Sequence, residues 1–228
     1  MAGKLKAFLR RKKKNSYGSS ADLEAPVIAG SALEDCKVFS NRESALELVS
    51  THGMVVEVGV AYGDFSAHLL SRLKPREFFA IDSFNHLSKD NDLWGNERMK
   101  QSQLSHLEYY QERFGPEISS GMVKVLQGLS WECLDQLEDA SADLIYIDAD
   151  HAYESVLRDL ETALRKVKPD GIIQVNDYTN FDPVAGEPYG VMKATNEVIN
   201  AHNLKIAGFA FHPLGFHDVC LRISARAD

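Results

Sequence analysis

Polar side chains that could bind a cation follow two apolar segments in the second half of the chain. Asp148 and His151 come after the apolar segment 144–147, and Asn176 and Asp177 come after the next one. Because ligands collect at the carboxyl ends of parallel strands, we expect these side chains to face one crevice. Oxygen donors favour Mg²⁺ or a similar divalent cation, so Asp148, Asn176 and Asp177 are the expected metal ligands. The alternative is that they cap the helix and loop that follow.

A second pattern predicts a nucleoside site. Residues 55–63 read VVEVGVAYG, an apolar run with an acid and then a turn of small residues. Such a turn lets the backbone approach a ligand before a helix begins. Asp82 ends the next apolar run, 19 residues after Gly63, where a carboxylate can accept hydrogen bonds from ribose hydroxyls.

The turn departs from the G-x-G-x-x-G fingerprint of dinucleotide-binding folds. It reads Gly59-x-Ala61-x-Gly63, with Glu57 two residues ahead of the first glycine. This form resembles the first motif of the class I S-adenosylmethionine-dependent methyltransferases. The alternative is an ordinary strand-to-helix turn in another α/β protein.

The elements around these motifs alternate between strand and helix patterns. A capping-box pattern of Ser40 and Glu43 predicts a helix before the first strand. Strands are expected near 55–58, 77–81, 122–127, 143–147 and 172–176, with helices over 64–73 and 153–167. This alternation predicts an α/β fold with a doubly wound sheet.

The C-terminal part changes this pattern. Two apolar stretches, 205–211 and 216–223, are separated by four residues, which permits an antiparallel hairpin but not a parallel crossover. A parallel sheet closed by such a hairpin again resembles the class I methyltransferase fold. That resemblance covers about residues 38–224 and implies a Rossmann-like, seven-stranded sheet of order 3-2-1-4-5-7-6 with the last strand antiparallel.

The polar clusters resemble those of the metal-dependent small-molecule O-methyltransferases that act on catechols or on sugars of natural products. The resemblance implies that Asp148 is the first metal ligand and a catalytic residue, His151 the catalytic base, and Asp177 the second acid of a pair. Asn176 stands where a carboxylate is expected, which would weaken metal affinity. Gly128 and Ser130 follow the third strand, where such enzymes contact adenine.

Ten residues are therefore expected to bind the cofactor: Glu57, Gly59, Ala61, Tyr62, Gly63, Asp82, Ser83, Gly128, Ser130 and Asp148. The segment 83–121 is long for a crossover and is interpreted as an insert that forms a lid or substrate wall. Aromatic residues of the loop 178–190 could stack on a sugar or aryl acceptor, or anchor the loop.

Charge is unevenly distributed along the 228 residues. Seven of the 25 basic residues lie in the first 14 positions without an acid, and the remainder carries 18 basic against 33 acidic residues. We expect residues 1–21 to be a basic, disordered tail and linker, with membrane contact as the alternative, and 22–228 to be one domain. The anionic body disfavours nucleic acid as a partner. Three widely spaced cysteines and the lack of a long apolar run favour a cytoplasmic protein, with a membrane-peripheral one as the alternative.

Together these patterns predict an S-adenosylmethionine-dependent O-methyltransferase that methylates a hydroxyl of a small molecule, assisted by a divalent cation such as Mg²⁺. Two other classes stay open at this point. A nicotinamide-dependent oxidoreductase also uses a glycine turn and a ribose acid, although the hairpin and the acids argue against it. A non-catalytic nucleoside-binding or scaffold protein, with or without self-association, is the other.

Overall fold

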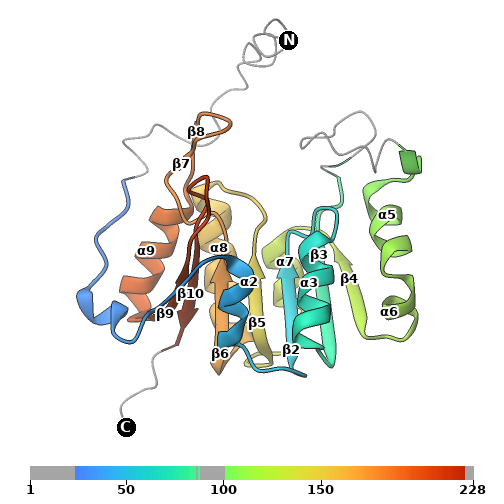
Figure 1. Ribbon diagram of the computed structural model, residues 1–228, viewed down its shortest axis with the longest axis horizontal. Coiled ribbons are helices and arrows are strands. Elements are labelled where there is room, and N and C mark those ends of the chain that lie inside the picture. The colour runs from blue at the N-terminus through green and yellow to red at the C-terminus, as the bar shows by residue number, and fades with distance from the viewer. Residues whose placement is uncertain (1–23, 86, 88–100, 224–228) are drawn as a thin grey trace, which may run out of the picture.

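The computed structural model describes residues 24–85, 87 and 101–223. A twisted sheet of eight strands forms its centre, and helices cover both faces (Figure 1). The expected α/β, Rossmann-like fold is confirmed. The predicted tail and linker, 1–21, and much of the predicted lid lie outside the described residues.

The strands follow the order β1-β9-β10-β6-β5-β2-β3-β4. Read from the other edge and numbered from β2, seven of them run 3-2-1-4-5-7-6, and β1 is added beyond them. Only β10 among the eight is antiparallel to its neighbours, β6 and β9. The strands of this sheet are β1 (Lys37–Phe39), β2 (Met54–Val58), β3 (Glu77–Asp82), β4 (Val123–Gln127), β5 (Ala142–Ile147), β6 (Val167–Val175), β9 (Lys205–Ala210) and β10 (Asp218–Arg222).

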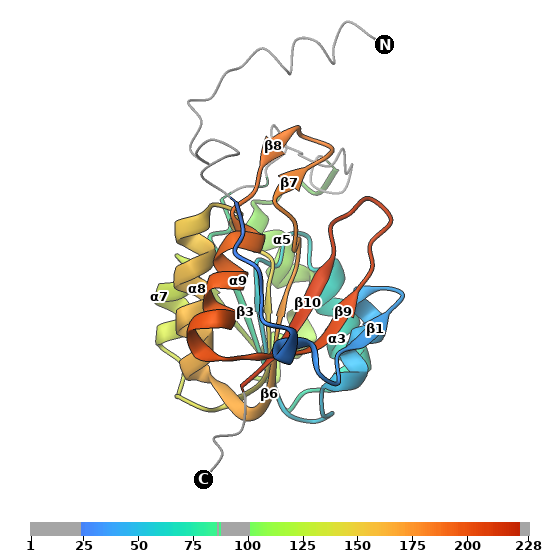
Figure 2. The same cartoon turned by 90° about the vertical axis from the view of Figure 1, so that its left-hand side faces the viewer.

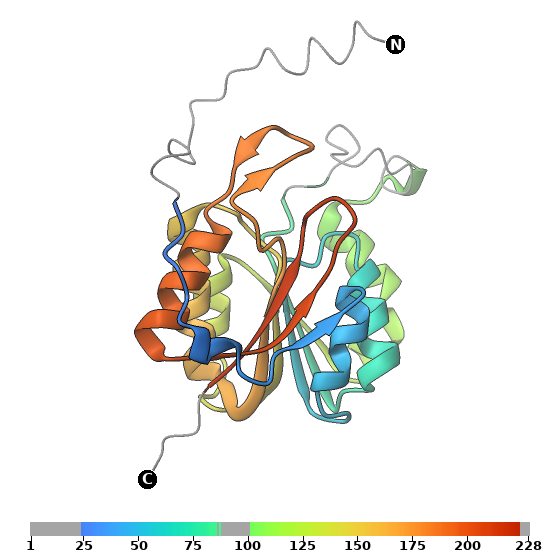
Figure 3. The same cartoon turned by 60° about the vertical axis from the view of Figure 1, so that its left-hand side comes forward.

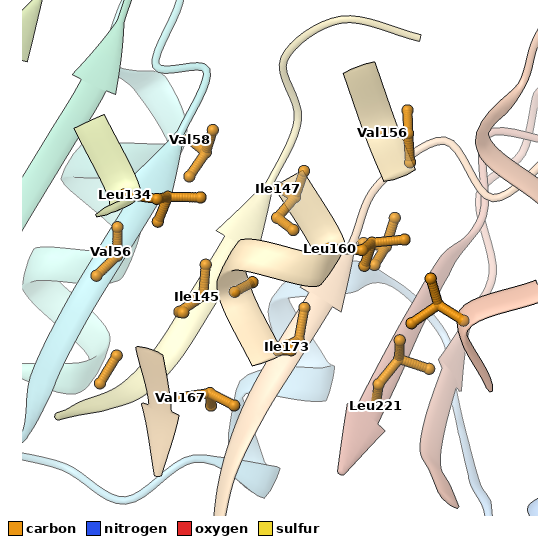
Figure 4. Close-up of a cluster of buried hydrophobic side chains, with 14 of the residues drawn as sticks. Val56, Val58, Leu134, Ile145, Ile147, Val156, Leu160, Val167, Ile173 and Leu221 are labelled. Atoms are coloured by element: carbon orange, nitrogen blue, oxygen red, sulfur yellow. The ribbon is translucent and has the colours of Figure 1, made fainter. Parts of the chain in front are cut away.

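Two helical layers bury opposite faces of the sheet. Side chains alternate along β2, so Val56 and Val58 pack on one face and Val55 on the other. The first face, drawn in Figure 4, is covered by α7 (Ser130–Asp135), α8 (Tyr153–Lys166) and α9 (Val191–His202). The second face is covered by α2 (Arg42–Ala45), the 3₁₀ turn η3 (Leu46–Leu48), α3 (Asp64–Leu73) and α5 (His106–Arg113), which leads into α6 (Gly115–Ser119).

Loops gather at the carboxyl edge of the parallel strands. A small hairpin of β7 (Phe181–Asp182) and β8 (Glu187–Pro188) follows β6, and a longer turn joins β9 to β10. Both project from the same end of the molecule in Figures 2 and 3. A 3₁₀ turn, η2 (Gly30–Leu33), precedes β1. Within the described ranges, no helix has the length and apolar character needed to cross a membrane.

One local expectation about a helix start needs correction. The helix expected from Ser40 begins at Arg42 instead, because the side chain of Asn41 accepts the Ser44 N–H at 2.8 Å and provides the N-cap. In the insert, α5 begins at a capping box of Ser105 and Glu108. Arg42 is therefore the first residue of α2, and its side chain belongs to the site described below.

Candidate functional site

The turn after β2 requires glycine for a steric reason. Gly59 has φ +86°, and a Cβ on it would lie 1.9 Å from the backbone oxygen of Asp148, at the end of β5. Gly63, with φ +77°, would place a Cβ 2.5 Å from the ring of Phe114. Ala61 also adopts a positive φ of 44°. The turn is therefore pressed against two neighbouring segments, and a side chain at Gly59 or Gly63 would clash with them.

The carboxylate of Asp82 braces this turn. Its Oδ2 accepts the N–H groups of Val60 and Ala61 at 2.9 and 3.4 Å, and its Oδ1 accepts that of Phe84 at 2.8 Å. The expected neighbour of the turn is thus in place, at the end of β3. Its role as a ribose acceptor stays a prediction.

Helix α5 supports the turn from the other side, a contact that the sequence did not indicate. The Nε2 of the buried His106 lies 2.6 Å from the carbonyl oxygen of Ala61. Arg113 donates to the carbonyl oxygen of Tyr62 at 2.5 Å and to Asp64 at 2.7 Å. The described part of the insert therefore shapes the turn directly, in addition to any role as a lid.

A pocket of about 410 Å³ opens beside the turn. Its size suits a small ligand. Five of the expected cofactor residues line it, namely Glu57, Gly59, Ala61, Tyr62 and Asp148. Val60, Asp64, Phe65 and Arg42 complete the described lining.

The other expected cofactor residues lie near the turn but outside this described lining. Gly63 begins α3, and Ser83 directly follows Asp82. Gly128 donates its N–H to the backbone oxygen of Asp82 at 3.0 Å, and Ser130 opens α7. These positions extend from the turn along the ends of β3 and β4, the direction in which the adenine was expected.

Glu57 is buried beneath the turn and forms no ion pair with any residue that the structure describes. Its carboxylate accepts a hydrogen bond from the Ser66 hydroxyl, which in turn accepts one from Tyr110 at 3.0 Å. Burial raises the pKa of Glu57 to about 8, against the opposing effect of the Ser66 hydrogen bond. Glu57 is therefore neutral at pH 7 and fixes α3 and α5 against β2.

Asp148, His151 and Asp177 converge at the ends of β5 and β6. One ligand atom from each lies within 4.8 Å of the others. The Nε2 of His151 is 3.4 Å from Asp177 Oδ2 and 4.0 Å from Asp148 Oδ1, and it has no hydrogen-bond partner among the described residues. The structure therefore brings together three of the four residues singled out at these strand ends.

Burial and neighbouring carboxylates shift the pKa values of Asp177 and His151 in this cluster. Burial raises the pKa of Asp177 to about 6, and the nearby Asp148 adds to the effect. Burial alone would lower the pKa of His151, but the carboxylates of Asp148 and Asp177 raise it above its usual value. Asp177 also has a positive φ of 53°, an uncommon backbone conformation for a residue other than glycine.

Asn176 is held by a different set of contacts. Its Nδ2 donates to Asp218 Oδ1 at 3.1 Å, and Gln174 donates to the other oxygen at 2.8 Å. Asp218 is buried, and burial raises its pKa to about 7. Sequence reasoning missed Asp218, since it lies on the last strand and follows no recognisable motif. The amide of Asn176 is oriented by this acid, with its oxygen still able to accept.

Arg42 and Tyr146 are two further site residues that the sequence did not reveal. Arg42 Nη1 donates to the Tyr146 hydroxyl at 2.8 Å and lies 3.7 Å from Asp148 Oδ2. The guanidinium stacks on Phe65, 4.4 Å from the ring centroid. Arg42 precedes β2 by a dozen residues, so only the fold brings it to the carboxyl edge.

The loop after β6 covers the acid cluster. The ring of Tyr189 stacks on His151 with 4.2 Å between centroids, and its hydroxyl donates to Asp182 at 3.0 Å. Tyr178 donates to Asn196 of α9. Phe181, on β7, is 47% exposed and is the one of the three predicted stacking residues that faces solvent.

Comparison with known proteins adds a decisive observation. The family described as "Methyltransferase domain" matches residues 56–178, which span the turn, both strand ends and the cluster. The chain belongs to this methyltransferase family. It is an S-adenosylmethionine-dependent methyltransferase of class I, and the oxidoreductase alternative is set aside. A search of the curated proteins gave no match.

Solved methyltransferase structures share the fold. A protein from Staphylococcus aureus, provisionally assigned as a caffeoyl-CoA O-methyltransferase, is 15% identical, with 96% of this chain and 97% of that chain covered and a TM-score of 0.54. A SAM-dependent methyltransferase from Aquifex aeolicus is 17% identical over 90% of this chain and 99% of that one, with a TM-score of 0.53. The tRNA methyltransferase TrmK of B. subtilis is 12% identical over 80% and 65%, with a TM-score of 0.52. At these identities the likeness establishes the fold only.

Proposed function

We propose that this methyltransferase acts on a hydroxyl group of a small molecule and that a divalent cation assists it. The observation that carries the proposal is the convergence of Asp148, His151 and Asp177 beside the turn. Asp148 belongs to both places, because it lines the pocket and contributes to the cluster. A methyl donor and an acceptor hydroxyl can therefore meet at this residue.

The cluster suits a cation on chemical grounds. Two carboxylates provide hard oxygen donors. Burial and then the nearby Asp148 raise the pKa of Asp177, and a cation would offset both effects. The buried Nε2 of His151 forms no hydrogen bond with a described residue, which favours a ligand or substrate group as its partner. Asp148 and Asp177 would hold the ion, with the oxygen of Asn176 as a further donor. Such an ion lowers the pKa of a bound hydroxyl and orients it.

His151 is the proposed general base. The acceptor oxygen forms a bond to the methyl carbon, the carbon–sulfur bond breaks, and its electron pair stays on sulfur as S-adenosylhomocysteine. The acceptor proton passes to Nε2 of His151, which is unprotonated above its raised pKa. Tyr189 fixes the plane of the imidazole by stacking on it.

The charge of the chain and its exposed aromatic rings favour a small-molecule acceptor over RNA. Outside the first 14 residues the chain has 15 more acidic than basic residues, which would repel a phosphate backbone. The β7–β8 hairpin and the β9–β10 turn instead offer the exposed rings of Phe181 and Phe211 at the same edge. Such rings suit a sugar or aryl group.

The direct test is methyl transfer from labelled S-adenosylmethionine to a panel of catechols and glycosides, with EDTA and after adding back Mg²⁺ or Mn²⁺. We expect product that EDTA abolishes and metal restores. His151→Ala and Asp148→Asn should each lower kcat at least ~100-fold. Asp135→Asn, at an exposed site on α7, is the matched control and should leave kcat unchanged.

Unchanged turnover in both site variants would remove the proposed roles. Binding of S-adenosylhomocysteine without transfer to any acceptor, whatever the metal, would favour the scaffold alternative. Thermal shift with S-adenosylhomocysteine and with NAD reports ligand binding independently of turnover.

A further inference from the structure

The pocket beside the turn has an uneven charge lining. Of its lining residues, all in the described part of the chain, Arg42 alone carries a positive charge. Glu57 is neutral at pH 7, since burial raises its pKa to about 8. Asp64 is engaged by Arg113 at 2.7 Å. Asp148 lies beside Arg42, so the guanidinium is balanced on one side and is the one group among the described lining residues that can attract an anion.

The guanidinium of Arg42 is fixed in orientation before any ligand arrives. It lies on the ring of Phe65, and its Nη1 bonds to the fully buried Tyr146. The backbone is held as well, because Gln174 donates to the Arg42 carbonyl oxygen at 3.4 Å. Its Nε lies 3.5 Å from Glu43 Oε1, whereas Nη2 donates to no described residue, and the side chain is 32% exposed. A guanidinium has five N–H donors, so this one retains capacity for an anion.

We infer that Arg42 binds the carboxylate of the amino-acid end of S-adenosylmethionine. This inference rests on the proposed function in taking that cofactor as the ligand of this pocket. The cofactor has one anionic group, its α-carboxylate, whose two oxygens match the planar fork of a guanidinium. Arg42 would thus set the direction of the cofactor, with the amino-acid end toward α2 and the nucleoside toward β3 and β4.

The same contact joins the cofactor to the acid cluster. Arg42 Nη1 lies 3.7 Å from Asp148 Oδ2, so one guanidinium faces the cofactor carboxylate and a residue of the cluster. Arg42 is therefore a cofactor-positioning residue that the expected motif, Glu57 to Asp82, does not include.

Deleting the carboxylate from the ligand gives the sharpest test. Isothermal titration would compare S-adenosylhomocysteine with its decarboxylated analogue, 5′-deoxy-5′-(3-aminopropylthio)adenosine. We expect the wild-type protein to bind S-adenosylhomocysteine ~10- to 100-fold more tightly than the analogue. Arg42→Met should weaken the binding of S-adenosylhomocysteine but not that of the analogue, so the ratio of the two affinities should fall to about one. Arg42→Lys should restore part of the ratio.

Controls separate this role from a structural one. Retained binding of the analogue by Arg42→Met shows that the pocket is folded. Arg165→Met, at an exposed arginine paired with Asp135, should keep the wild-type ratio. Equal weakening of both ligands by Arg42→Met would overturn the inference while leaving the proposed function intact. Failure of the wild-type protein to bind either ligand would overturn both.

Discussion

Glu57 illustrates how a single residue of the cofactor motif can be read differently once its surroundings are known. The sequence marks it as an acid next to a nucleoside, yet only 1% of it is exposed. Burial raises its pKa, so its neutral form is the one that the folded state prefers. Its main physical effect is on stability, through the chain of hydrogen bonds with Ser66 and Tyr110.

The pH dependence of unfolding tests this interpretation. The folded pKa of about 8 lies above the usual 4.5, so the folded state binds the proton more tightly and loses stability as pH rises between these values. Relative to Glu57→Gln, the wild-type free energy of unfolding should fall by about 4 kcal/mol from pH 4.5 to pH 8. Urea titrations across this range measure it.

Glu47→Gln, at an exposed site, serves as the control and should follow the wild-type curve. Parallel curves for wild type and Glu57→Gln would mean that Glu57 ionises in the folded protein, contrary to the interpretation. Burial also raises the pKa of three other acids, Asp159, Asp177 and Asp218, so they too lower stability as pH rises. Both proteins contain these acids, so their contribution cancels in the difference between wild type and Glu57→Gln.

The sequence predicted which residues carry the chemistry of the acid cluster, but it did not predict which other side chains contact them. Asp148, His151 and Asp177 could be found because each follows an apolar run that ends at the same sheet edge. Arg42, Tyr146 and Asp218 could not, since they approach from α2, from the strand interior and from the last strand. Their contacts depend on which strands are neighbours.

The elements around the turn act together as its support. Helix α5, from a segment interpreted as a lid, holds the carbonyl oxygens of Ala61 and Tyr62 through His106 and Arg113. Hydrogen bonds of this kind contribute about 1 kcal/mol each. They keep the backbone N–H groups of the turn directed toward Asp82.

Removing this support should weaken cofactor binding. The double variant His106→Phe, Arg113→Met keeps ring packing near Phe84 but loses both contacts. We expect the Kd for S-adenosylhomocysteine to rise about tenfold, as measured by isothermal titration. Glu112→Gln on the same helix is the control, and an unchanged Kd in the double variant would show that α3 and Asp82 suffice.

Local sequence pattern predicted the long helices and strands, whereas short elements and helix starts depend on tertiary contacts. The long amphipathic helix α8 has a strong helical periodicity, and the buried strands are continuous apolar runs, so the sequence predicted both. The three-residue strand β1 was not, because it is too short to show a pattern and forms by pairing with β9. The first helix was predicted too early, because Asn41 competes successfully with Ser40 as the cap.

The candidate functional residues and several exposed apolar side chains lie at one edge of the sheet. The turns after β2, β5, β6 and β9 all lie at one edge of the sheet, and the apolar side chains of Phe181, Val184, Phe211 and Leu214 are exposed there. Pro26 and Val27 pack against α9, where Pro26 accepts a hydrogen bond from Asn196, the partner of Tyr178, and Val27 accepts one from Asn200. The basic segment 1–14 precedes them in sequence.

Membrane contact, the alternative role of the basic segment, can be tested. If the segment attracts an anionic surface, sedimentation with phosphatidylglycerol vesicles should fall on deleting 1–21 or on raising salt, because each basic residue contributes about 1 kcal/mol. Neutral phosphatidylcholine vesicles are the control. Methyl transfer to a water-soluble acceptor should be unaffected, and equal sedimentation of full-length and truncated protein would leave the segment without this role.

The contact between Gly59 and the Asp148 carbonyl has a consequence for redirecting the enzyme. A side chain at Gly59 would clash with the Asp148 backbone, so the turn and the acid cluster cannot be separated by substitution at this contact. New acceptor preferences should therefore be sought by varying the β7–β8 hairpin and the β9–β10 turn, whose tips are open. Libraries confined to those two loops would sample new specificities while sparing the reacting geometry.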